Sequence, residues 1–150
     1  MVLFVVTGFL DPVPTTPFSR DDWPRHITVS TNFEIDDDGS DLVTSLSAAL
    51  DGAGPVAASA GAPAGFGHDG NVPVVLVDPP QPWRDLHDRV RAVILRSGGR
   101  FTTPHSGDAY RPHATDTRAG AWTGAADVTS LHLVRLDGGT ATVDATLPLG

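Results

Sequence analysis

The chain has 150 residues, of which 40% are hydrophobic and 19% charged, and these proportions are typical of one soluble globular domain with a sizeable core. Because it contains no cysteine, disulfide bridges, thiolate zinc sites and cysteine nucleophiles are excluded. The formal net charge of −8 repels polyanions, so a long nucleic acid is an unfavourable partner, whereas a small nucleotide held by a few local cations is compatible with it.

The first predicted element is a buried strand. Residues 2–6 form a continuous apolar run with β-branched side chains, which is typical of a central strand. Residues 1–10 lack the basic start and the small-residue cleavage site of a signal peptide, and the run is too short to span a bilayer. We therefore expect a cytoplasmic protein with no membrane contact. Residues 11–24 contain four prolines and are predicted to form a loop.

The next strand has a polar face and an apolar face. Residues 26–35 alternate with a period of two, which predicts a strand with one buried side. We expect helices to cover the apolar face and the polar face to line a cleft. The polar face carries His26, Thr28, Ser30, Asn32 and Glu34, and the apolar face carries Ile27, Val29, Thr31, Phe33 and Ile35.

The middle of the chain is predicted to form a helix and two strands. Residues 36–40 are interpreted as a turn, and apolar side chains at helical spacing over residues 42–50 predict an amphipathic helix. Residues 52–71 are rich in glycine, alanine and proline, and we expect a small-residue strand followed by a loop. Residues 72–77 are predicted to form a second buried strand.

The second half of the chain continues with a helix, a short strand and a hairpin. The helix is indicated by apolar side chains that line one face, namely Trp83, Leu86, Val90, Val93 and Ile94. After a loop over residues 100–110 we expect a strand around His113. Residues 131–136 and 140–147 are predicted to pair as a hairpin across Asp137-Gly138-Gly139.

Two short stretches each place a histidine two residues before a threonine. They are Pro24-Arg25-His26-Ile27-Thr28 and Arg111-Pro112-His113-Ala114-Thr115. In an extended strand residues i and i+2 point to the same side, so each stretch presents an imidazole and a hydroxyl together. One motif falls in each half of the chain, and a pair of such motifs is suited to hold one phosphate from both sides. The sequence therefore predicts a pseudo-symmetric cleft.

These motifs resemble a known family. The two His-x-Thr motifs, the Gly65-Phe66-Gly67 stretch, the helix between Trp83 and Arg96 and the closing Leu147-Pro148-Leu149-Gly150 resemble the 2H phosphoesterase superfamily, in its branch of 2',5' RNA ligase-like proteins and RNA cyclic phosphodiesterases. The resemblance implies a single α+β domain over residues 1–150 with two pseudo-symmetric lobes. It implies two antiparallel sheets around a central groove, with helices outside, and metal-independent cleavage of 2',3'-cyclic or related cyclic phosphodiesters.

The chemistry of that reaction suits the residues at hand. Opening a cyclic phosphodiester with water requires a base, an acid, and donors to the non-bridging oxygens. Histidine suits both proton roles because its ordinary pKa is about 6.5. We predict His26 and His113 as the catalytic pair, with Thr28 and Thr115 donating hydrogen bonds to the phosphoryl oxygens. The resemblance implies His26 as the acid and His113 as the base.

Arginine position distinguishes the two motifs. Arg111 lies two residues before His113 and shares its face, so we predict it to bind the phosphate, with a surface salt bridge as the alternative. Arg25 is adjacent to His26, points the other way and is expected to cover the outer face. Trp23 and Trp122 are expected to pack in the core, although either is able to stack on a base.

The remaining histidines are interpreted mainly as structural. His87 is expected in a solvated charge cluster on a helix, and His132 as a satisfied core histidine. His68 and His105 lie in predicted loops and are candidates for the rim of the groove.

Three functional hypotheses follow from the sequence. The leading one is a cytoplasmic, monomeric cyclic phosphodiesterase that acts on a small nucleotide or an RNA terminus with a cyclic phosphate. The second is a non-catalytic nucleotide or RNA-end binding module, which the acidic charge and the weak alternation over residues 116–118 favour. A metal-dependent hydrolase is disfavoured because no paired ligand spacing falls on one face, so we expect no metal and no other cofactor.

Overall fold

The computed structural model describes residues 1–36 and 38–150, so Asp37, in the predicted turn over residues 36–40, lies outside the described residues. Two α-helices, one 3₁₀-helix and ten strands make up the described fold. The helices are α1 (Ser40–Leu50), α2 (Gln81–Arg96) and the 3₁₀-helix η1 (Gly107–Ala109). The strands are β1 (Val2–Phe9), β2 (Phe18–Ser19), β3 (His26–Ile35), β4 (Val56–Phe66), β5 (Val72–Asp78), β6 (Arg100–Phe101), β7 (His113–Thr115), β8 (Ala125–Val128), β9 (Ser130–Asp137) and β10 (Thr140–Pro148).

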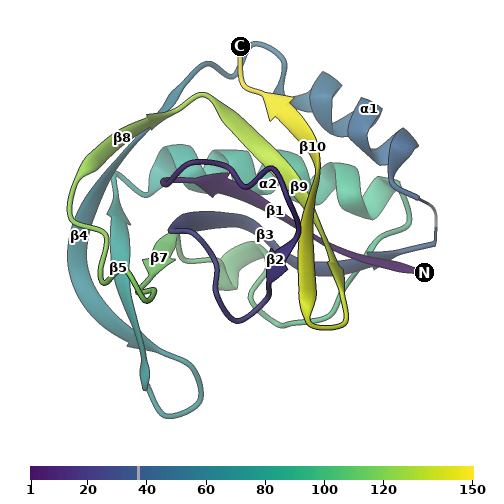
Figure 1. Cartoon of the computed structure of the whole chain (residues 1–150). Helices are drawn as coiled ribbons and strands as arrows, with labels where there is room; N and C mark the ends of the chain where they lie inside the picture. The colour runs from purple at the N-terminus through teal and green to yellow at the C-terminus, as the bar shows by residue number, and fades with distance from the viewer. Residues whose placement is uncertain (37) are drawn as a thin grey trace.

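All strand pairs are antiparallel, and together they form one curved sheet in the order β2-β10-β9-β1-β3-β7-β5-β4-β8, with β6 beside β3. Strands β4, β5 and β8 lie on one side of the molecule and β9 and β10 on the other, with β1, β3 and β7 between them (Figure 1). One lobe contains β2, β10, β9, β1, β3 and β6, and the other contains β7, β5, β4 and β8. In the sheet the two lobes are joined where β3 pairs with β7, through Ile27 and Ala114. The predicted antiparallel α+β fold is confirmed, and the two expected sheets are joined edge to edge.

Both helices pack against the same apolar face of the sheet. In Figure 1, α2 runs behind the middle of the sheet and α1 lies beside β10. The predicted core face of β3 is confirmed, because Ile27, Val29 and Phe33 are fully buried and belong to the cluster that the helices cover. The helices contribute Leu42, Leu46, Leu50, Trp83, Leu86, Val90, Val93 and Ile94 to that cluster. The opposite face of β3 is therefore left for a groove.

The predicted alternation of β3 is wrong at Ser30 and Thr31. The register between β1 and β3 shifts on both sides of the Val6–Ser30 pair, so β3 carries a bulge there. Ser30 is buried and its hydroxyl donates to the carbonyl of Thr31, 3.0 Å away. Thr31, which was expected on the core face, lines the groove instead.

Other elements differ from the expectation mainly in length. A two-residue strand, β2, interrupts the predicted loop and pairs with β10. The second motif strand, β7, has only three residues, and β8 forms where no element was predicted. Neither α1 nor α2 has the length and apolar composition of a membrane-spanning helix, and residues 1–36 and 38–150 contain no other candidate.

Candidate active site at the junction of the lobes

The register of β3 and β7 brings the two motifs together. Ile27 and Ala114 are paired, and both point into the core with no exposed surface. In a strand the flanking side chains point to the opposite face, and in an antiparallel pair the neighbours of paired residues lie across from each other. The motif histidines and threonines, His26, Thr28, His113 and Thr115, therefore meet on one face, where all four line a groove of about 790 Å³.

The two histidines are oriented in the same way. Nδ1 of His26 lies 2.8 Å from the carbonyl oxygen of Pro24, and Nδ1 of His113 lies 2.7 Å from that of Arg111. A carbonyl only accepts, so each Nδ1 carries a proton and donates. In both rings Nε2 is then the nitrogen available for proton transfer in the groove.

Burial lowers the pKa of both imidazoles. For His26 the loss of solvation has the largest effect, the bond to the carbonyl of Pro24 opposes it, and the positive charge of His113 lowers the pKa further. For His113 burial is again the largest cause, the carbonyl of Arg111 opposes it, and the charges of Arg111 and His105 add to the lowering. Each imidazole therefore favours its neutral form at neutral pH, and a charge on one opposes a charge on the other.

An aromatic ring lies beside each motif histidine. The ring centroids of Trp23 and His26 are 4.6 Å apart, and those of Phe66 and His113 are 4.4 Å apart. Trp23 packs against a small hydrophobic cluster, as expected of a core residue, but it also lines the groove. The only sequence signal for Phe66 was its place in the Gly65-Phe66-Gly67 stretch.

Arg111 belongs to the groove lining and Arg25 does not, which agrees with the side of the strand predicted for each. Arg111 lines the groove with its guanidinium 4.9 Å from the centre of the Phe66 ring, a cation–π distance. None of the ion pairs among the described residues involves Arg111.

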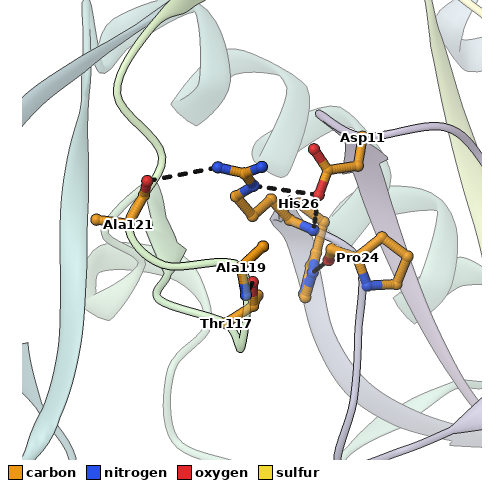
Figure 2. A network of polar contacts seen from close by, with 7 residues as sticks. Asp11, Pro24, His26, Thr117, Ala119 and Ala121 are labelled. Carbon is orange, nitrogen blue, oxygen red and sulfur yellow. Dashed lines mark hydrogen bonds and ion pairs between the residues drawn. The ribbon is translucent and has the colours of Figure 1, made fainter.

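Arg25 joins two loops instead of lining the groove. Its Nε donates to a carboxylate oxygen of Asp11 at 3.2 Å, and one terminal nitrogen donates to the carbonyl of Ala121 at 3.5 Å. Figure 2 shows these bonds beside the bond from His26 to Pro24. Arg25 thus connects the start of the first motif strand with the loop that follows the second motif.

The remaining histidines only partly match their predictions. His105 lines the groove, whereas the His68 side chain is fully exposed and is not part of the groove lining. His132 is buried as expected. Its Nδ1 has no hydrogen-bond partner among the described residues, so the prediction of a fully hydrogen-bonded core histidine is wrong. The solvated cluster expected around His87 is also wrong, because that side chain is only 1% exposed. His87 lies one turn after Trp83 on the core face of α2, a position that the neighbouring charged residues conceal.

Sequence reasoning missed several polar groups of the groove. The hydroxyl oxygens of Thr31 and Thr103 and one carboxylate oxygen of Asp116 are buried without a hydrogen-bond partner in the described structure, and all three residues line the groove. Thr103 lies in the predicted loop over residues 100–110, and nothing in its sequence neighbourhood marks it. In the parts of the chain that the structure describes, no three His, Asp or Glu side chains form a group able to hold a metal ion. Trp122 packs in the core, as predicted.

Comparisons with known proteins agree with this architecture. Residues 15–145 match the model of the 2'-5' RNA ligase superfamily, while no curated protein sequence matches the chain. A phosphoesterase crystal structure is similar with a TM-score of 0.67 and 17% identity, over 99% of this chain and 98% of that one. The protein TT0787 of Thermus thermophilus is similar with a TM-score of 0.66 and 18% identity, over 99% and 98% of the two chains. E. coli LigT complexed with NADP+ is similar with a TM-score of 0.65 and 16% identity, over 99% of this chain and 97% of that one. LigT complexed with 3'-AMP is similar with a TM-score of 0.59 and 16% identity, over 99% and 98% of the two chains.

Proposed function

The chain belongs to the 2'-5' RNA ligase superfamily, and on this basis we propose that it opens a 2',3'-cyclic phosphate, or a related nucleotide cyclic phosphodiester, by acid–base catalysis with two histidines and no metal ion. One observation carries the proposal: His26 and His113 line a single groove, and each has its Nδ1 bound to a backbone carbonyl. The hydroxyl-bearing residues Thr28 and Thr115 line the same groove.

In the proposed reaction a water oxygen attacks phosphorus while Nε2 of His113 takes the water proton. The bond from phosphorus to one ribose oxygen breaks, and protonated His26 gives its Nε2 proton to that oxygen. The product is a phosphomonoester with a free ribose hydroxyl. Hydroxyl donors from Thr28 and Thr115 and the guanidinium of Arg111 stabilise the negative charge that grows on the non-bridging oxygens.

The proposed substrate is a small nucleotide or the end of an RNA chain. A groove of about 790 Å³ falls within the range of small-molecule sites, roughly 300 to 1,000 Å³. LigT, which shares the fold, was crystallised with the small nucleotides NADP+ and 3'-AMP. The net charge of −8 favours such a ligand over a long polyanion, whose binding requires many cationic contacts.

The first test is direct hydrolysis. Purified protein is incubated with 2',3'-cyclic nucleotides between pH 5 and 9, with and without EDTA, and the phosphomonoester is identified by chromatography. His26→Ala and His113→Ala are each expected to lower kcat by about 10²- to 10⁴-fold, because each removes one proton-transfer group. His68→Ala, which removes an imidazole from outside the groove lining, serves as the control and keeps wild-type turnover.

Three results would contradict the proposal. Cyclic nucleotides that stay intact across the pH range, with His113→Ala indistinguishable from wild type, remove the catalytic role. Activity that EDTA abolishes and a divalent metal restores contradicts the metal-independent mechanism. Nucleotide binding that Arg111→Ala abolishes, in the absence of any hydrolysis, identifies the chain as a binding module.

A further inference from the structure

The first motif strand lacks a strand partner along part of one edge. Among the strands that the structure describes, none pairs with this edge of β3 between its contact with β7 and its contact with β6. An exposed row of backbone carbonyls would result, and such groups require other donors when they are buried. Those donors are the Tyr110 hydroxyl to Thr28 at 2.9 Å, a His87 ring nitrogen to Val29 at 2.6 Å, and the Thr102 amide to Asn32 at 3.0 Å.

His87 makes a hydrogen bond at each of its ring nitrogens. Its Nδ1 donates to the carbonyl of Val29, and its Nε2 accepts from the amide of Gly107, 2.9 Å away. A ring with one donor and one acceptor nitrogen is neutral. The imidazole also stacks on the ring of Tyr110, with centroids 4.0 Å apart and planes within 4° of parallel.

These contacts connect the two motifs. Val29 directly follows Thr28 of the first motif, so the His87 bond holds the strand that carries this motif. Gly107 begins the segment that leads into the second motif, and the carbonyl of Arg111 in that segment orients the imidazole of His113. Tyr110 completes the link, because its hydroxyl reaches from the same segment back to the carbonyl of Thr28.

We propose that neutral His87, together with Tyr110, is a positioning group that sets the separation of the two motif histidines. His87 is absent from the groove lining, whereas Tyr110 lines the groove with its hydroxyl donating to the carbonyl of Thr28. The proposal assigns proton transfer to neither residue. The local bonds of His26 and His113 fix the orientation of each ring, whereas the distance between the rings depends on how β3 is held against the 107–113 segment. In-line displacement requires both Nε2 atoms at fixed places on either side of phosphorus, so an error of about 1 Å costs on the order of 100-fold in rate.

The inference rests on the proposed function, and its main test is a pair of substitutions at His87. His87→Phe retains a planar ring for Tyr110 and removes both hydrogen bonds, so kcat is expected to fall about 10- to 100-fold with KM changed less than about threefold. His87→Gln carries one amide donor and one amide acceptor, and we expect it to recover part of the lost kcat. Wild-type kcat in a folded His87→Phe variant would overturn the proposal.

Tyr110→Phe tests the same link with the loss of one oxygen atom. It leaves the stacked rings in place but removes the donor to Thr28, so kcat is expected to fall about fivefold to tenfold. Thr7→Val is the matched control, because the Thr7 hydroxyl donates to the carbonyl of Ile27 at 3.0 Å from the opposite edge of the same strand, which β1 also holds. A loss of stability in both variants and a loss of kcat only in Tyr110→Phe supports positioning. Equal kcat in the two variants overturns it.

A second readout separates this inference from the proposed reaction. Long-range ¹H–¹⁵N NMR reports the tautomers of His26 and His113 without any substrate, and titration with inorganic phosphate reports binding in the groove. In His87→Phe we expect both rings to keep the Nδ1–H tautomer, because the bonds that fix it are local. We expect the affinity for inorganic phosphate to fall, because phosphate is held only by groups of the two motifs, whose separation changes. If the wild type hydrolyses no cyclic nucleotide, the proposed function fails, while unchanged phosphate affinity in a His87→Phe variant that keeps both tautomers refutes the positioning role.

Discussion

The orientation of His26 and of His113 is decided within three residues of sequence. Each ring binds the carbonyl two positions earlier, so the bond depends on local backbone conformation and not on a distant side chain. Substitutions elsewhere therefore leave the tautomer of each ring intact as long as the motif strand is held in place. Proton affinity, in contrast, is set by burial and by the neighbouring positive charges.

This environment predicts the pH profile of the reaction. The productive free enzyme has one motif histidine protonated and the other neutral, and burial lowers the pKa of both. We expect a bell-shaped pH profile of kcat/KM with its maximum below pH ~6.5. The value falls towards pH 8 because the acid loses its proton. The measurement is kcat/KM for a 2',3'-cyclic nucleotide from pH 4.5 to 9. A maximum at pH 8 or above would contradict the effect of burial.

At the scale of elements, the β4–β5 hairpin supplies the wall beside His113. Phe66 ends β4 and contacts both His113 and Arg111, so the path of the hairpin determines where this wall stands. Gly65 is essential to that path, because a Cβ atom at this position would collide with the backbone carbonyl of Gly70 across the turn. The backbone cannot yield here without moving Phe66.

Gly65→Ala is therefore expected to act on both stability and activity. The clash with Gly70 predicts a loss of about 1 to 3 kcal/mol in the free energy of unfolding, together with a lower kcat/KM as Phe66 shifts. Urea denaturation and steady-state kinetics measure the two effects. Gly139→Ala is the control in the β9–β10 hairpin, since a Cβ atom there meets nothing within 4 Å. Equal behaviour of the two variants would contradict the role of the close approach.

The sequence predicts elements well where periodicity decides them. The strand over residues 26–35 has the predicted bounds because its alternation is clear, and the helix faces follow from apolar spacing. The bulge at Ser30 escaped prediction because a hydroxyl side chain suits either face. Strand β8 escaped because Ala125, Ala126 and Asp127 have weak strand propensity, and β4 supplies the pairing that makes them a strand.

For the same reason, only part of the candidate site could be predicted from the sequence. The two-residue spacing within each motif was sufficient to predict that His26, Thr28, Arg111 and His113 share one groove. The contacts of His87 join three segments that are distant in sequence, and no local pattern reports such a meeting. Charged neighbours along α2 even favoured an exposed position for it.

For the whole molecule, buried histidines link folding to pH. Burial lowers the pKa of His26, His87, His113 and His132 below the ordinary value of 6.5. As the pH falls through about 6.5, the unfolded chain takes up protons before the folded protein does. The stability that these neutral rings contribute is therefore complete above pH 6.5 and is lost as the pH falls below it.

We expect the free energy of unfolding to be lower at pH 5.5 than at pH 7.5. Each such histidine contributes at most about 1.4 kcal/mol per pH unit while it is protonated only in the unfolded chain. Urea denaturation at the two pH values measures the difference, and His132→Asn, which removes one buried ring away from the groove lining, is expected to reduce it. Stability that increases towards pH 5.5 would contradict this linkage.

The single residue pair between β3 and β7 has a mechanical consequence. The sheet itself therefore contributes little to the connection between the lobes where Ile27 meets Ala114. Three side chains make hydrogen bonds across this seam: Arg25 to Ala121, His87 to both Val29 and Gly107, and Tyr110 to Thr28. Beyond the strand pair, these bonds and the hydrophobic cluster that extends beneath both lobes therefore carry the load between them.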